Sequence, residues 1–99
     1  MAQIKRDMLF GTTVIVRWIA PVISDAGTVT SPPRLEAQVN AGAWVTVVTL
    51  PGTSVEDARK PCGFDIEIQT DRIFVVTYAL ADDDTIVQRR STDRGATWA

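Results

Sequence analysis

By residue type and spacing, the acidic side chains are the best candidates in this chain for a metal-binding or catalytic site. Asp82, Asp83 and Asp84 are consecutive, and clustered carboxylates suit a hard cation such as Ca²⁺. The run lacks the alternating ligand spacing and the glycine of a calcium-binding loop. We therefore expect a solvated turn here rather than a metal site.

A second acidic group consists of Asp65, Glu67 and Asp71. Two carboxylates at a suitable separation can hydrolyse a glycosidic bond. Asp65 and Glu67, however, occupy alternate positions of an expected strand, which places both on its polar face. Such a face ordinarily meets solvent, so we expect no catalytic carboxylates.

Histidine is absent from the 99 residues, and cysteine occurs once. The chain therefore lacks the usual imidazole general base and the commonest metal ligand. Cys62 alone forms neither a disulfide within the chain nor a cysteine-rich zinc site, and we expect it to be a small apolar residue rather than a reactive thiol. These residues predict a protein that is not an enzyme and needs no metal or other cofactor.

Length and charge narrow the possibilities further. A chain of 99 residues suits one domain, 1–99, with a single core. Ten basic and twelve acidic residues give a net charge of −2, which offers no electrostatic reason to expect nucleic-acid binding. The most apolar stretch, Thr12–Ile23, is interrupted by Arg17 and Pro21. We expect no membrane span and no targeting segment, hence synthesis in the cytoplasm.

Valine, isoleucine and threonine are abundant and favour extended backbone, so the chain is expected to be all-β. Thr13–Ala20 is apolar on both sides and predicts a strand buried on two faces. The expected strands are Gln3–Phe10, Thr13–Ala20, Arg34–Val39, Ala43–Leu50, Phe64–Gln69, Arg72–Leu80 and Thr85–Arg90.

Two segments fall outside this pattern. Ile23–Pro33 is rich in serine, threonine, glycine and proline and predicts a loop with at most a short edge strand. The segment 51–63 is also expected to be loop-rich, with one helical turn that begins at Ser54 and ends at Pro61.

The C-terminal residues spell Ser-x-Asp-x-Gly-x-Thr-Trp, with Ser91, Asp93, Gly95, Thr97 and Trp98 at the fixed positions. The pattern predicts a β-hairpin over 85–99. In it Asp93 accepts hydrogen bonds from backbone N–H groups, Gly95 takes a positive φ and Trp98 packs beneath the turn.

This motif resembles the Asp box of the bacterial neuraminidase repeat, found in sialidases, other propellers and various small β-proteins. The resemblance implies a structural turn that lies away from any active centre. A sialidase also needs an arginine cluster, a tyrosine nucleophile with a glutamate, and an aspartate acid/base. Tyr78 is the only tyrosine and no motif surrounds it or Glu67, so we expect no sialidase activity.

An internal echo leaves two folds open. Gln38–Trp44 and Ser91–Trp98 both run from a strand through a polar turn with Gly-Ala to a tryptophan. Two propeller blades are therefore conceivable, in a unit that must oligomerise to close a ring. We favour a small antiparallel β-sandwich, immunoglobulin-like or fibronectin-like, because it buries its core within one chain.

Five residues are candidate contacts to a carbohydrate or a protein partner: Trp44, Trp98, Arg89, Arg90 and Arg94. Aromatic rings can stack on sugars, but we expect the tryptophans, Trp18 included, to belong to the core. The arginines could bind phosphate or an acidic partner surface, but we expect them to pair with Asp82–Asp84 and Asp93.

Small all-β proteins with one Asp box also resemble accessory components of tailed-bacteriophage particles. This resemblance implies a non-enzymatic virion protein of the capsid decoration, neck, tail or fibre, made in the host cytoplasm. Its partners would be other structural proteins, in a homo-oligomer or symmetric complex, with Ser91–Ala99 expected at the contact because the motif ends the chain. The alternative is a carbohydrate-binding module or an oligomeric two-blade lectin, with a glycan as the ligand.

Overall fold

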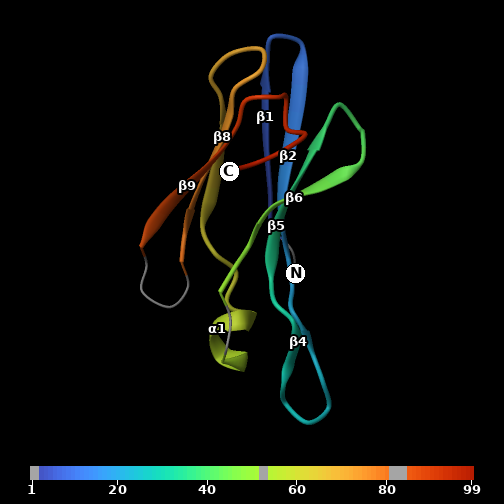
Figure 1. The fold of residues 1–99 in the computed structure, drawn as a ribbon, viewed down its shortest axis with the longest axis vertical. Coiled ribbons are helices and arrows are strands. Elements are labelled where there is room, and N and C mark those ends of the chain that lie inside the picture. Colours follow the sequence, from blue (N-terminus) through green and yellow to red (C-terminus); the bar gives the residue numbers. More distant parts are fainter. Residues whose placement is uncertain (1–2, 52–53, 81–84) are drawn as a thin grey trace.

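The computed structural model describes residues 3–51, 54–80 and 85–99, and strands make up most of them (Figure 1). The elements are β1 (Ile4–Leu9), β2 (Thr12–Ile19), β3 (Val22–Ile23), β4 (Val29–Ser31), β5 (Arg34–Val39), β6 (Trp44–Thr49), α1 (Val55–Arg59), β7 (Phe64–Ile68), β8 (Phe74–Ala79) and β9 (Ile86–Ser91).

Two antiparallel sheets form the body of the protein. One has the strand order β1-β2-β5-β6 and the other β7-β8-β9, and they lie side by side in Figure 1. The fold is therefore the predicted small all-β sandwich. The chain completes the first sheet before it begins the second, whereas immunoglobulin domains connect their sheets by Greek-key crossovers. The layers are those expected, and the connectivity is simpler.

The core lies between the facing sides of these sheets. Alternation along β2 and β8 turns every second side chain inward, so that Val16 and Phe74 are fully buried. β8 is the central strand of its sheet, as its apolar sequence predicts. The buried residues in contact there are Val14, Val16, Trp18, Leu35, Ala37, Val47, Leu50, Cys62, Ile66, Ile68, Phe74, Val76 and Tyr78.

The expectation that Thr13–Ala20 is buried on both faces is wrong for the outer face. Val14, Val16 and Trp18 point into the core, but Ile15 and Ile19 are only half-buried. Both sheets cover each other on one side, and among the described residues no third layer covers the outside of β2. On this outer face, Arg17 contacts Glu36 of β5 and the ring of Trp44 of β6.

The strand β1 places charged side chains on the core side of its sheet. Register with β2 places Lys5 opposite Val16 and Asp7 opposite Val14, on the core side, while Ile4 and Met8 lie on the outside. Alternation in β2 therefore determines that Ile4 and Met8, with Arg6 between them, face away from the core.

The inward charges of β1 bind the edge of the other sheet. Asp7 Oδ2 accepts a hydrogen bond from the Ile68 N–H at 2.9 Å, and Lys5 Nζ lies 3.7 Å from Asp65 Oδ1. β7 is an edge strand, so Asp7 occupies a backbone donor that another chain could otherwise use. These contacts close one side of the sandwich.

The two segments expected to be loop-rich each contain some regular structure. Within 23–33 the chain forms the β3–β4 hairpin, which extends away from the body (Figure 1). Ser54 caps α1 by accepting the Asp57 N–H at 3.1 Å, as predicted, and Pro61 follows the helix. The buried Ala58 attaches this short helix to the body. Cys62 is buried, and desolvation raises the pKa of its thiol, so it is a packing residue as expected.

Replacing Asp7 with alanine should lower the free energy of unfolding by about 1–2 kcal/mol, because the Ile68 N–H loses a charged acceptor. Urea denaturation measures the change. Asp25→Ala removes a carboxylate from the exposed β3–β4 loop and should leave stability within about 0.5 kcal/mol. Equal effects of the two substitutions would show that the link between β1 and β7 contributes nothing.

Candidate interaction site

The C-terminal turn, residues 91–99, is held by side-chain hydrogen bonds. The Ser91 hydroxyl donates to Asp93 Oδ1 at 2.8 Å and accepts the Gly95 N–H at 2.7 Å. Asp93 in turn accepts the Thr97 N–H at 2.9 Å on Oδ1 and the Thr97 hydroxyl at 2.5 Å on Oδ2. The turn is thus held by the Asp93 carboxylate rather than by hydrogen bonds between strands, and accepting a backbone N–H is the role predicted for Asp93.

Trp98 packs beneath the turn, as its position in the motif predicts. Its ring is partly buried against the core, and its Nε1 donates to the Gly95 carbonyl at 3.1 Å. Ala99 then pairs with Arg90 through two backbone hydrogen bonds, 2.9 and 3.0 Å long. The chain therefore turns back and Ala99 pairs with β9, but the structure has no return strand over 92–99, so the hairpin predicted over 85–99 is a strand followed by a turn.

Gly95 brings the turn into contact with the opposite sheet. Its φ is +84°, and a Cβ added there would lie 2.8 Å from Val39 Cγ2 of β5. Phe74 of β8 lies 3.5 Å from the same point. The turn therefore closes over the end of the core, and only glycine satisfies both the backbone angle and the space.

The two similar segments, Gln38–Trp44 and Ser91–Trp98, occupy equivalent positions in the two sheets. Gln38–Trp44 follows the third strand of the first sheet, and Ser91–Trp98 follows the third strand of the second. The side chains nevertheless act differently. Asn40 Oδ1 accepts the Thr13 N–H from β2, whereas Asp93 bonds within its own turn.

Trp44 and Trp98 consequently lie in different environments. Trp44 was expected in the core, and it lies instead on the outer face of β6, because its partner in the β5 register is the outward Gln38. The Arg17 guanidinium stacks 3.8 Å from the centroid of its ring. Trp44 is thus a covering residue on the outside of the sheet.

The arginine under Trp44 belongs to a closed ionic cluster. Glu36 accepts from Arg17 Nη2 at 2.8 Å and from Arg34 Nε at 2.9 Å. Burial alone would raise the pKa of Glu36, but these hydrogen bonds outweigh it and hold the pKa below its ordinary value. Each charge in this cluster is satisfied within the protein.

The predicted basic cluster of Arg89, Arg90 and Arg94 does not form. Arg89 and Arg90 are neighbours in β9 and therefore point to opposite faces of the sheet. Arg90 Nη2 contacts Gln69 Oε1 at 3.4 Å, and Arg94 Nη2 contacts Asp71 at 3.4 Å. Pairing of Arg94 with Asp93 was the wrong expectation, because Asp93 is occupied inside the turn. Asp82–Asp84 lie outside the described residues.

The remaining candidates for chemistry are dispersed. Asp65 and Glu67 are exposed on the outer face of β7, as predicted, and Tyr78 is buried on the inner face of the same sheet. Glu67 and Tyr78 therefore lie on opposite sides of the sheet. Within the three described ranges no group of acidic or cysteine side chains is arranged to hold a metal ion.

The β1–β2 hairpin carries an exposed apolar surface that the sequence interpretation missed. Ile4, Met8 and Phe10 are 66, 65 and 59 % exposed, and Leu9 beside them is 46 % exposed. Met8, Leu9 and Phe10 are consecutive at the end of the hairpin, where a soluble domain ordinarily covers a group of large apolar side chains. The signal in the sequence was the run Met8-Leu9-Phe10 directly before Gly11, which predicts an apolar hairpin tip.

No protein-family model matches this chain, and neither a curated protein nor a solved structure is similar to it. The described chain has one helix, α1, whose five residues are far too few to cross a bilayer. The sites are therefore interpreted from their geometry.

Replacing Gly95 with alanine should lower the free energy of unfolding by about 2 kcal/mol, because the new Cβ is strained at positive φ and overlaps Val39. Thermal or urea unfolding measures the loss. Gly63→Ala is the matched control, since nothing lies within 4 Å of its added Cβ. If both variants unfold at the same urea concentration, the turn does not pack on β5 as described.

Replacing Asp93 with asparagine should destabilise the protein in a pH-dependent way. Hydrogen bonds from Thr97, with a further one from Ser91, lower the pKa of Asp93 from 3.8 to about 2. A lowered pKa stabilises the folded state above 3.8, and this contribution is lost as the pH falls towards 2. The urea midpoints of the two proteins should therefore differ near neutral pH and converge towards pH 2.

Asp71→Asn provides the comparison, because Asp71 makes only the exposed contact to Arg94. Its urea midpoint should follow that of the unsubstituted protein over the same pH range. A constant difference between Asp93→Asn and the parent, down to the lowest pH, would contradict the role assigned to the carboxylate.

Proposed function

We propose that this chain is a non-enzymatic structural protein that joins a larger assembly through the β1–β2 hairpin. The supporting observation is the group of exposed apolar side chains on this hairpin: Ile4 and Met8 on the outer face of the edge strand β1, and Leu9 and Phe10 at its end. Apolar groups of this size meet solvent at a cost of about 25 cal/mol per Å², which a protein partner would remove.

The turn conformation supports a role for the Phe10 side chain. Phe10 and Gly11 form a two-residue connection with φ values of +54° and +71°. Turns with two positive φ values favour Asn-Gly, and a bulky residue in the first position is strained by about 1 kcal/mol. The strained, exposed Phe10 therefore lowers the stability of the isolated domain. A contribution of its ring to binding a partner would account for its presence in the turn.

The inverted polarity of β1 supports the same surface. Its inward residues Lys5 and Asp7 are held by β7, and Ile4 and Met8 face outward with Arg6 between them. An edge strand that presents this face is suited to packing against the apolar surface of another structural protein. A second copy of the chain is the other partner that this surface would accept.

We place the assembly in a tailed-bacteriophage virion, as a capsid, neck, tail or fibre accessory protein made in the host cytoplasm. Support comes from the resemblance of Ser91–Trp98 to the Asp box and from the small all-β fold. The carbohydrate-binding alternative, whether a module or a two-blade lectin, is less well supported. Its best aromatic residue, Trp44, stacks on Arg17, and Trp98 packs on the core.

The test separates binding from folding. The double variant Met8→Ser, Phe10→Asn should raise the free energy of unfolding by about 0.5–1 kcal/mol, because asparagine suits the positive φ of the turn. The same variant should be lost from virus particles purified from the source of the chain by density-gradient sedimentation. Quantitative mass spectrometry of the particle fraction measures its copy number.

Ile86→Ser is the matched control, because Ile86 is 65 % exposed but lies on β9, away from the hairpin. This variant should enter particles at the level of the unsubstituted protein. Absence of the unsubstituted chain from particles would overturn the virion assignment. Normal incorporation of the double variant would show that the hairpin is not the contact. Sedimentation equilibrium of the free protein tests whether two copies of the chain associate through the hairpin.

A further inference from the structure

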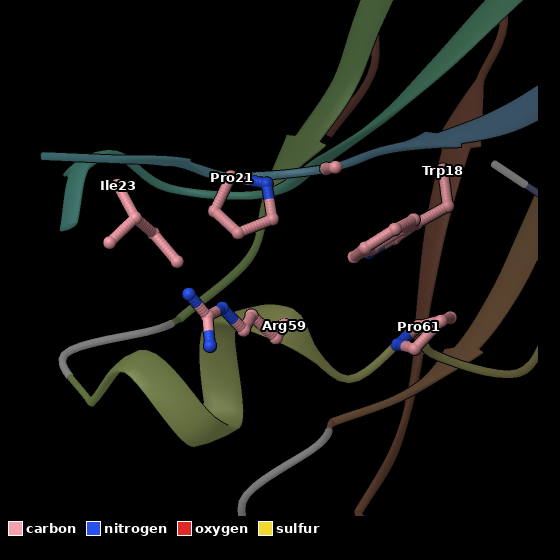
Figure 2. Close-up of a pocket in the computed structure, with 6 residues that line it drawn as sticks. Trp18, Pro21, Ile23, Arg59 and Pro61 are labelled. Atoms are coloured by element: carbon pink, nitrogen blue, oxygen red, sulfur yellow. The ribbon is translucent and has the colours of Figure 1, made fainter. Parts of the chain in front are cut away.

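A pocket of about 460 Å³ lies where α1 meets the end of β2, far from the β1–β2 turn (Figure 1). Figure 2 shows the ring of Trp18 reaching into the space between Pro21 and Pro61, with Ile23 and Arg59 at the far side. The wall is completed by Ala20. The volume is within the range of small-molecule sites, and most of the lining is apolar.

The indole N–H of Trp18 is an unused donor at this pocket. The residue is only 3 % exposed, and its Nε1 has no hydrogen-bond acceptor in the part of the chain that the structure describes. An unsatisfied buried N–H costs about 1–3 kcal/mol. The other tryptophan that packs on the core, Trp98, does find an acceptor, the Gly95 carbonyl. Among the described residues, Trp18 Nε1 is therefore the one fully buried side-chain donor that lacks a hydrogen-bond partner.

Arg59 supplies a second unused donor on the opposite wall. Its neighbour Lys60 lies 3.5 Å from Asp57, but Arg59 makes no ion pair within the described ranges. Arg59 belongs to the last turn of α1 and lies beside Ile23 in Figure 2. Arg59 is exposed, so its guanidinium places a solvent-accessible positive charge beside the apolar lining of the pocket.

The side chains that line the pocket offer donors and apolar surface only. The two donors are the Trp18 indole and the Arg59 guanidinium, and no lining side chain is an acceptor. A complementary ligand has a flat apolar body to lie between the proline rings and the indole. It also carries an anionic group for Arg59 and an acceptor for the indole N–H.

We propose that this pocket binds a small organic carboxylate with a ring-shaped apolar body and a second hydrogen-bond acceptor. The carboxylate pairs with Arg59, the ring packs between Pro21 and Pro61, and the acceptor takes the Trp18 N–H. The site is independent of the assembly proposed above, because none of the exposed apolar residues Ile4, Met8, Leu9 and Phe10 lines it.

The probe is 4-acetylbenzoate, which has a ring, a carboxylate and a carbonyl acceptor. Titration of the ¹⁵N-labelled protein should shift the indole resonance of Trp18, identified by its loss in Trp18→Phe, and should give a millimolar or tighter Kd. The neutral 4-acetylbenzamide should bind roughly tenfold more weakly, as should 4-ethylbenzoate, which lacks the carbonyl.

Arg59→Gln should reduce the affinity for 4-acetylbenzoate to that for the amide. Arg72→Gln is the matched control, because it removes an exposed arginine from the β7–β8 turn at the opposite end of the sandwich from α1 (Figure 1). The backbone amide spectrum of each variant verifies its fold. The proposal is overturned if 4-acetylbenzoate causes no shift at millimolar concentration, if it binds no better than the amide, or if Arg59→Gln leaves its affinity unchanged.

Discussion

Burial of one face of each sheet against the other is the constraint on which the rest of this structure depends. The chain has one core, and the inward residues of β2 and β8 fill it. This packing fixes the register of each strand, because a shift by one residue would turn Val14, Val16 and Trp18 to solvent. It also determines the face on which every other residue of these sheets lies.

Polar groups at the ends and edges of the sandwich are satisfied by specific carboxylates. Asp7 binds the β7 edge, Glu36 joins two arginines on the outer face, and Asp93 organises the C-terminal turn. All three carboxylates therefore serve to stabilise the fold. The apolar hairpin tip and the buried indole N–H of Trp18 are two features for which the described residues provide no partner.

Local pattern was sufficient for much of the fold. Alternation predicted β7 and the β5–β6 hairpin, and Ser54 marked the start of α1. The roles of Asp93, Gly95 and Trp98 followed from their types and spacing, because the bonds involved span only a few residues. The outward position of Trp44 could not be obtained in this way, since it depends on which face of a sheet is buried. The separation of Arg89 from Arg90 does follow from local alternation, because neighbouring residues of a strand point to opposite faces.

By itself the sequence determined an all-β chain without histidine, with strands, turns and caps near their observed places. These features depend on neighbouring residues and on backbone preference. Only the tertiary structure decided that β1 turns Ile4 and Met8 outward, that Gly95 meets Val39, and that Trp18 and Arg59 line one pocket. Each of these depends on register or packing between residues distant in the chain, which no local pattern specifies.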